Sequence, residues 1–159
     1  MKSVLLAYYS FGETPKVILK LEELFSKKDF LVTKEEIKIS PDIEPKKQFK
    51  HEKKIVLENK SLDITSFDAI IVGTPIVSFT SVPAINVFIR NLPKANNKKF
   101  VLFATGIGLP GRTIKKMKSL LSMRGGKVIE SQAFTSIFEF DKKKLIEVEK
   151  FFDKLIEKI

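Results

Sequence analysis

Residues 4–9, Val-Leu-Leu-Ala-Tyr-Tyr, lead directly into Ser10-Phe11-Gly12-Glu13-Thr14 and then Pro15. The apolar run is typical of a buried strand, and the proline is typical of the first turn of a helix. Thr14 is the expected N-cap, because a hydroxyl there can accept a hydrogen bond from a free amide of that turn. Amides and the helix dipole at such a junction favour an anion, so the loop predicts a phosphate site.

The rest of the chain continues the alternation of strand and helix. Further strands are expected at 29–39, 69–72, 100–104 and about 127–134, and helices at about 15–27, 83–92, 111–124 and after an N-cap at Asp141. Residues 69–72 are apolar on both faces, as in a central parallel strand. The pattern predicts an α/β fold, a three-layer sandwich whose five-stranded parallel sheet has the order 2-1-3-4-5 with helices on both faces.

Two more strand ends carry loops rich in Gly, Thr, Ser and Pro, at 74–83 and 105–111. The carboxyl ends of parallel strands share one edge, so the three loops predict one ligand crevice between the first and third strands. The first loop, at 10–14, fits neither G-x-x-x-x-G-K-[ST] nor G-x-G-x-x-G, which disfavours the phosphate loops of P-loop NTPases and dinucleotide-binding Rossmann domains there. An ordinary turn with a hydroxyl cap is the alternative for the first loop.

Length and composition limit the classes of protein to consider. The 159 residues suit one domain spanning 1–159, and no stretch approaches the roughly 20 apolar residues of a membrane span. The absence of cysteine excludes disulfides and thiolate chemistry, and with His51 as the sole histidine we expect no metal site. The apolar run after Met1-Lys2-Ser3 suits a buried strand better than a signal peptide, so a cytoplasmic protein is expected.

The net charge of +10 comes from 29 basic and 19 acidic residues. Only three of the cations are arginines, Arg90, Arg112 and Arg124, and they are scattered along the chain. Arginine is the residue that base readout and phosphate forks favour. A solvated lysine-rich surface is therefore preferred to a nucleic-acid site, and no nucleic-acid or membrane partner is expected.

Three segments resemble parts of flavodoxin-like FMN proteins. Residues 4–17 are similar to the family's first strand and [ST]-x-T-G-x-T phosphate loop. Residues 67–83 are similar to its third strand and its G-[ST]-P loop beside the flavin, and residues 105–111 to its second flavin loop. The likeness extends over essentially the whole chain, with Gly73-Thr74-Pro75 as its most specific part. It implies an FMN-binding redox protein, either an electron carrier or a small NAD(P)H-dependent reductase.

The resemblance also implies which residues contact FMN. The phosphate is expected at Ser10, Phe11, Gly12, Glu13 and Thr14. One side of the ring is expected at Thr74, Pro75, Ile76, Val77, Ser78 and Phe79, and the other at Thr105, Gly106, Ile107 and Gly108. No residue is assigned a catalytic role. The implied partner is an acidic redox protein or a small-molecule electron acceptor, and the chain is expected as a monomer or a homodimer.

Two departures from the family pattern keep a second interpretation open. The phosphate loop is one residue shorter, and Phe79 is the only aromatic residue in a ring-flanking loop that has no Trp. The alternative is a flavodoxin-like domain that has lost flavin and serves as an interaction module. Response-regulator receivers are rejected, because residues 8–10 and 73–75 hold no carboxylate for Mg²⁺. A serine hydrolase is rejected because G-x-S-x-G is absent.

Overall fold

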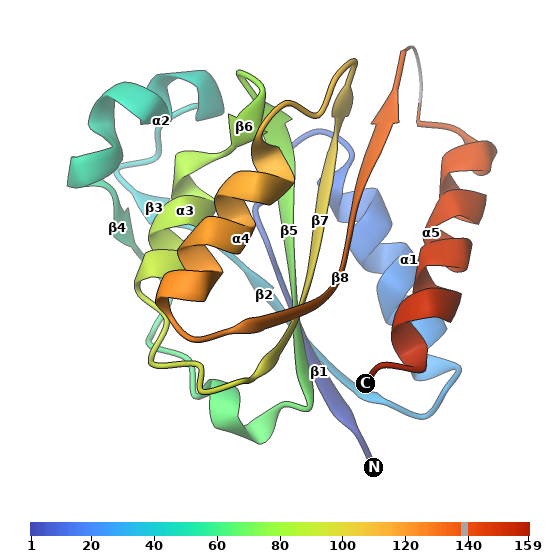
Figure 1. Cartoon of the computed structure of the whole chain (residues 1–159). Helices are drawn as coiled ribbons and strands as arrows, with labels where there is room; N and C mark the ends of the chain where they lie inside the picture. The colour runs from blue at the N-terminus through green and yellow to red at the C-terminus, as the bar shows by residue number, and fades with distance from the viewer. Residues whose placement is uncertain (138–139) are drawn as a thin grey trace.

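The computed structural model describes residues 1–137 and 140–159, and a parallel sheet forms its centre (Figure 1). Its strands lie in the order β2-β1-β5-β7-β8, and every neighbouring pair is parallel. In that order the strands are Leu31–Glu36, Ser3–Tyr8, Ala69–Val77, Lys99–Ile107 and Lys127–Ser136. The predicted strand order 2-1-3-4-5 is therefore confirmed.

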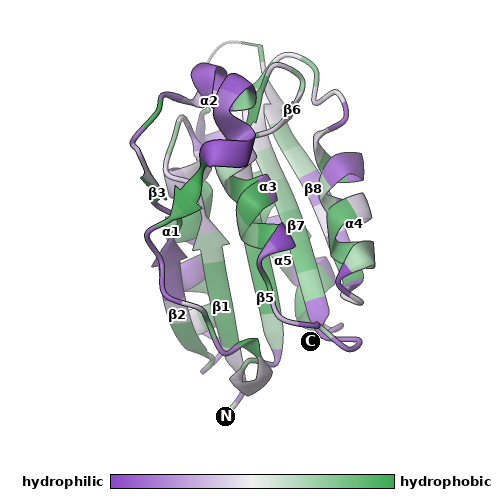
Figure 2. Ribbon diagram, turned by 90° about the vertical axis from the view of Figure 1, so that its left-hand side faces the viewer, coloured by the Kyte–Doolittle hydropathy of each residue, from purple (hydrophilic) through white to green (hydrophobic). Residues whose placement is uncertain are grey.

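Helices cover both faces of the sheet, which confirms the predicted three layers (Figure 1). Helices α1 (Thr14–Ser26) and α5 (Lys142–Ile156) lie on one face, and α3 (Pro83–Arg90) and α4 (Thr113–Met123) lie on the other. Phe25 of α1 and Phe152 of α5 meet edge to face with ring centroids 4.9 Å apart. Figure 2 shows the central strands as predominantly apolar, since both of their faces are buried against helices.

The helix starts show how local chemistry sets the boundaries. Asp141 is the N-cap of α5, as predicted, and its carboxylate accepts hydrogen bonds from the amides of Lys143 and Lys144 at 3.0 and 3.4 Å. The N-cap predicted at Thr14 is wrong by one residue. Glu13 is the N-cap of α1, without a side-chain capping bond, and Thr14 is the first helical residue. The Thr14 hydroxyl makes a tertiary contact instead.

The weak periodicity of the long polar connection at 40–66 allows a short helix, and the structure contains that helix and further short elements. It holds α2 (Pro45–His51), the 3₁₀ turns Glu52–Lys54 and Ile64–Ser66, and strand β4 (Val56–Leu57). Strand β4 pairs antiparallel with β3 (Ile39–Ser40), so the strand predicted at 29–39 is divided between β2 and β3. His51 is exposed, as predicted. Within the described ranges, no helix has the length and apolar character needed to cross a membrane.

Candidate functional site

The three predicted segments meet at the carboxyl edge of the sheet. Strand β1 lies beside β5 with Tyr8 opposite Gly73, and β5 lies beside β7 with Pro75 opposite Thr105. The chain reverses its direction of progress through the sheet between β1 and β5. Open α/β sheets bind ligands outside the strand ends at such a switch point. The register therefore brings together the segments that the sequence places far apart.

A buried hydrogen bond joins two of these segments. The Thr14 and Thr105 hydroxyl oxygens lie 2.8 Å apart, and both side chains are almost fully buried. The bond fixes the start of α1 to the end of β7. Thr74 performs a similar task in β5, where its hydroxyl donates to the Pro75 carbonyl at 2.9 Å and accepts from the Val82 amide at 3.2 Å. These three threonines hold the loops in place.

Exposure divides the predicted residues into an outer and an inner set. Solvent reaches Ser10, Phe11, Gly12, Ser78, Phe79, Ile107 and Gly108. The half-buried members are Glu13, Ile76 and Gly106, and the buried ones are Thr14, Thr74, Pro75, Val77 and Thr105. The outer set is therefore accessible from solvent at this edge, whereas the buried residues support the loops from within.

The loop between β1 and α1 is open enough for a ligand to approach its backbone. Gly12 has φ +58°, and a methyl group added there would meet no atom within 4 Å. The Thr14 amide closes a turn onto the Phe11 carbonyl at 3.3 Å. Phe11 itself is 49% exposed, which is unusual for phenylalanine. An exposed aromatic ring beside an accessible glycine is consistent with a ligand site.

Glu13 places a negative charge in this loop, and Lys16 balances it. The Lys16 Nζ lies 2.8 Å from Glu13 Oε2, so the two charges are in contact. The same oxygen is buried and has no partner with hydrogen-bond geometry among the described residues, because the ion pair satisfies the distance but not the angles. An anion bound at the start of α1 would therefore meet both Lys16 and the Glu13 carboxylate.

The ring-flanking loop expected at 74–83 is a β-hairpin, so that expectation is corrected. Strand β5 runs on to Val77 and pairs antiparallel with β6 (Thr80–Ser81). The two turn residues, Ser78 and Phe79, have φ +52° and +62°, as in the tight turns whose twist suits a hairpin. The turn leaves the Phe79 ring 65% exposed at the edge of the sheet.

The loop after β7 packs directly on this hairpin. The Arg112 amide donates to the Phe79 carbonyl at 2.8 Å. A methyl group on Gly111 would lie only 2.2 Å from the same oxygen, so this approach requires glycine. Thr105, Gly106 and Ile107 belong to β7 itself, which corrects the loop expected at 105–111. The expected flavin loop is thus the end of a strand followed by a short turn.

Sequence reasoning missed a buried amide that supports the site. Gln48 of α2 is fully buried, and its Oε1 accepts from the Ala84 amide at 3.0 Å. Its Nε2 donates to the Tyr9 hydroxyl at 3.0 Å and to the Ile43 carbonyl at 2.9 Å. Burial raises the pKa of Tyr9, and the hydrogen bond from Gln48 opposes part of that rise. The only sequence signal is one uncharged polar residue within a run of lysines.

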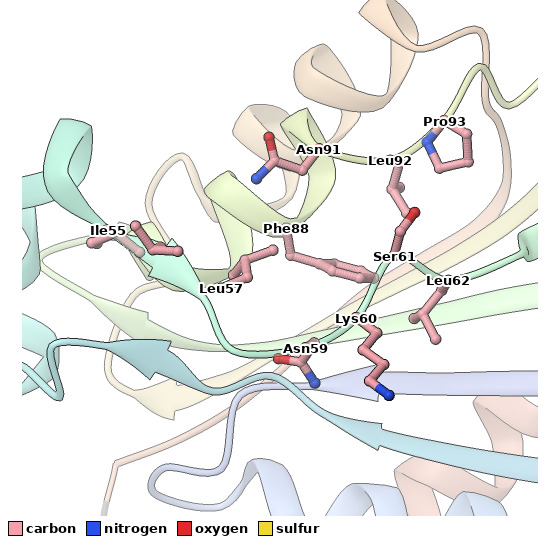
Figure 3. Close-up of a pocket in the computed structure, with 11 residues that line it drawn as sticks. Ile55, Leu57, Asn59, Lys60, Ser61, Leu62, Phe88, Asn91, Leu92 and Pro93 are labelled. Carbon is pink, nitrogen blue, oxygen red and sulfur yellow. The ribbon is translucent and has the colours of Figure 1, made fainter.

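Two hollows flank the α2–α3 side of the fold, and only one touches the predicted residues. A cleft of about 900 Å³ opens below the hairpin and shares Ser78 and Phe79 with the predicted site. A smaller hollow of about 360 Å³ lies between residues 55–62 and the C-terminal end of α3. Figure 3 shows the Phe88 ring at the centre of this smaller hollow, which contains none of the predicted residues.

Solved structures similar to this one include FMN proteins and flavodoxins. A flavoprotein from Lactobacillus acidophilus in complex with FMN is 21% identical, with a TM-score of 0.59 over 94% of this chain and 97% of its own. Flavodoxin 2 from Bacillus cereus in its oxidised form is 16% identical, with a TM-score of 0.69 over 99% of each chain. An apo NADH:FMN oxidoreductase is 17% identical, with a TM-score of 0.68 over 100% of this chain and 90% of its own.

These likenesses show that the fold is flavodoxin-like, which confirms the predicted resemblance at the level of the fold. No protein-family model and no curated protein sequence matches the chain. The identities are low, so the residues of the carboxyl edge have to carry any argument about function.

Proposed function

We propose that this chain binds FMN at the carboxyl edge of its sheet and serves in electron transfer. The observation that carries the proposal is the meeting of three segments at the β1–β5 switch point of a flavodoxin-like sheet. One of them is an open turn at a helix start, and the other two end in exposed apolar side chains at Phe79 and Ile107. A phosphate and a flat ring need this combination of a polar and an apolar contact surface.

The residues of the edge fit the two ends of such a ligand. Residues 10–13 would hold the phosphate through backbone amides at the start of α1. The Phe79 ring and the Ile107 side chain, 65% and 73% exposed, would cover the faces of the isoalloxazine and exclude water from it. Bound FMN would supply the electron-transfer chemistry. The protein would bind and orient it and set the electrostatic surroundings.

The finer activity is an electron carrier or a small NAD(P)H-dependent reductase. The solved structures above include flavodoxins and an NADH:FMN oxidoreductase, which supports both forms equally. An acidic redox protein or a small-molecule acceptor remains the proposed partner, because the chain is strongly basic. A cytoplasmic location remains a proposal made from the sequence.

A second candidate is an interaction module without flavin, and Glu13 favours it. A carboxylate in the phosphate loop repels a phosphate, and Lys16 neutralises it only in part. Direct titration of the protein with FMN separates the two candidates. Binding in the micromolar range, with quenched flavin fluorescence and a shifted absorption band, supports the first. A flat titration contradicts FMN binding and leaves the interaction module.

A glycine pair tests whether binding uses the predicted loop. Gly12→Ala puts a side chain on a backbone with φ +58° and should weaken FMN binding about tenfold or more, by distorting the loop. Gly125→Ala imposes similar strain at φ +79° beyond the far end of α4, where the new methyl group makes an ordinary contact. Circular dichroism checks that both variants fold. Equal affinities in the two variants would place the flavin elsewhere.

A further inference from the structure

The charges of this chain are strongly segregated along the sequence. Between Asp68 and Glu130 there are ten Lys and Arg residues and no Asp or Glu. This segment supplies β5, β6, α3, β7, α4 and the start of β8, and its two helices lie on the same face of the sheet (Figure 1). The helices of the other face, α1 and α5, carry cations and carboxylates in similar numbers, many of them in ion pairs. The positive field is therefore concentrated on the α3–α4 face.

The cleft of about 900 Å³ lies in that face, below the hairpin. Figure 1 shows β6 between α2 and α4, and residues of all three elements line the cleft. Its walls carry the exposed apolar side chains of Phe79 and Leu109 and the half-buried ring of Phe49. Asn86, only 3% exposed, lines its inner part and is fixed by hydrogen bonds to the Ser81 hydroxyl and carbonyl. The volume suits a drug-sized ligand.

Three cations line the same cleft and have no ionic partner. Arg112, Lys115 and Lys116, at the start of α4, form no ion pair with any residue in the described part of the chain. The one carboxylate in the lining is that of Glu52. It forms an ion pair with Arg90, whose Nη1 lies 2.8 Å from Glu52 Oε1. A cleft lined by charges of one sign focuses the field and raises the local concentration of ligands of the opposite sign.

We propose that this basic cleft is a second ligand site, which binds an aromatic ring carrying two or more phosphates, as in a nucleotide. The phosphates bind Arg112, Lys115 and Lys116, because a guanidinium fork and ammonium groups are the usual partners of phosphate. The ring packs against Phe49, because Phe79 is assigned to the flavin, as bases pack on aromatic side chains. The inference goes beyond the proposed flavin site, with which the cleft shares only Ser78 and Phe79.

A small ligand fits these observations better than a macromolecule. The three unpaired cations converge on one concave cleft and on one end of one helix, and aromatic and aliphatic side chains surround them. Nucleic acid or an acidic protein would instead read the whole basic face, including Lys118 and Lys127, which lie outside the cleft lining. A small ligand therefore depends on the cations inside the cleft, whereas a macromolecule depends also on the cations outside it.

Isothermal titration of the full chain tests the site, with the protein loaded with one equivalent of FMN so that the probes cannot bind in the flavin site. The probes are ADP, NADPH, tripolyphosphate and adenosine at about 0.15 M salt. We expect a dissociation constant of about 1–100 μM for ADP or NADPH, and weaker binding of tripolyphosphate and adenosine, which each lack one part of the ligand. Tighter binding of NADPH than of ADP shows that the site prefers a nicotinamide dinucleotide, and equal affinities show that it recognises the adenine nucleotide that the two share. Tripolyphosphate binding as tightly as ADP overturns the role of the ring.

Paired charge variants supply the control. Arg112→Gln/Lys115→Gln should weaken nucleotide binding at least tenfold, whereas Lys118→Gln/Lys127→Gln removes the same charge from outside the cleft and should change it less than twofold. Equal losses in both pairs would mean a diffuse basic surface and overturn the site. So would the absence of nucleotide binding at millimolar concentrations. FMN affinity measured on the same samples tests the flavin proposal separately, because neither pair lies in the predicted flavin residues.

Discussion

Glu13 is the residue whose charge bears most directly on phosphate binding. It is the N-cap of α1, so its carboxylate lies where the helix dipole already attracts negative charge. In the free protein that placement favours the helix start, and the ion pair with Lys16 at 2.8 Å adds to it. A bound phosphate would compete with the carboxylate for the same dipole and the same ammonium. The Glu13 carboxylate therefore stabilises the start of α1 in the free protein and lowers the affinity of the loop for a phosphate.

Replacing Glu13 by Gln should consequently raise the affinity for FMN. Removing one like charge a few ångströms from the phosphate is worth about a three- to tenfold gain in a surface site, and less at high salt. Fluorescence titration at low and high salt measures the change. Glu23→Gln is the matched control, because it removes a carboxylate of the same helix that pairs with Lys20 and Lys27 instead. A gain of equal size in the control would assign the effect to net charge.

Single residues are also where sequence reasoning was least complete. Thr14 is the first residue of α1, and its hydroxyl bonds to Thr105 and does not cap the helix as predicted. That partner is 91 positions away, and no local pattern could indicate it. Gln48 was missed for the same reason, since its burial depends on how α2 folds over Ala84 and Tyr9. Tertiary hydrogen bonds of this kind depend on packing that local sequence does not encode.

Elements were predicted well where hydrophobic periodicity decided them. The apolar run at 69–72 identified the central strand, but its continuation to Val77 and the hairpin that follows were missed. The hairpin turn uses Ser78 and Phe79 at positive φ, where Gly or Asn would have been the recognisable signal. A short helix was allowed within 40–66 but could not be placed, because only two residues of α2, Pro45 and Gln48, are buried and they leave no apolar stripe to detect.

Contact between the hairpin and the β7–α4 loop can be tested at Gly111. In Gly111→Ala the new methyl group would lie 2.2 Å from the Phe79 carbonyl oxygen, so one of the two loops must move. We expect a loss of about 1–3 kcal/mol in the free energy of unfolding, measured with urea. Gly108→Ala is the matched control, because its φ is also positive at +84° but the methyl group would meet open space. Similar losses in both variants would show that backbone strain, and not loop contact, causes the effect.

At the scale of the whole molecule, tyrosines and lysines with raised pKa values predict that the free energy of unfolding decreases at alkaline pH. Burial raises the pKa of Tyr8 and Tyr9 above the ordinary value near 10, and carboxylate partners raise the pKa of Lys20 and Lys34. A raised pKa in the folded state means that each contribution is complete below the unfolded pKa. Each is then lost as pH rises through the folded value. Stability should therefore fall above about pH 10.

Urea unfolding between pH 8 and 11 measures this loss of stability. A tyrosine variant separates the contribution of Tyr8 from that of the lysine ion pairs. Tyr8→Phe removes one half-buried phenol that has no hydrogen-bond partner among the described residues, so it should flatten the alkaline slope. Leu19→Ala, which changes an exposed apolar side chain on α1, should leave the slope unchanged. If Tyr8→Phe and wild type decline in parallel, the lysine ion pairs account for the loss.

The topology of the molecule was predicted correctly because it depends on patterns repeated along the whole chain. Alternating strands and helices with right-handed crossovers allow few arrangements, and the strand order 2-1-3-4-5 is one of them. The segregation of charge onto the α3–α4 face required the fold as well as the sequence. The acid-free segment from 69 to 129 becomes a surface feature only when α3 and α4 are packed side by side.

That segregation leads to a prediction about the potential of bound FMN. Reduction adds negative charge to the flavin, and cations within a Debye length of roughly 8 Å stabilise that charge. Arg112 and Lys115 follow the predicted second flavin loop directly, so they should move the midpoint potential to a less negative value. Removing them as Arg112→Gln/Lys115→Gln should lower the potential by about 10–30 mV at low salt, with a smaller change at high salt. Redox titration of the reconstituted protein measures the shift, and Lys118→Gln/Lys127→Gln should change the midpoint potential less.

If both double variants have the same midpoint potential as wild type at every salt concentration, the positive charge of Arg112 and Lys115 does not act on the flavin. The basic face would then act only on ligands and partners that bind outside the site.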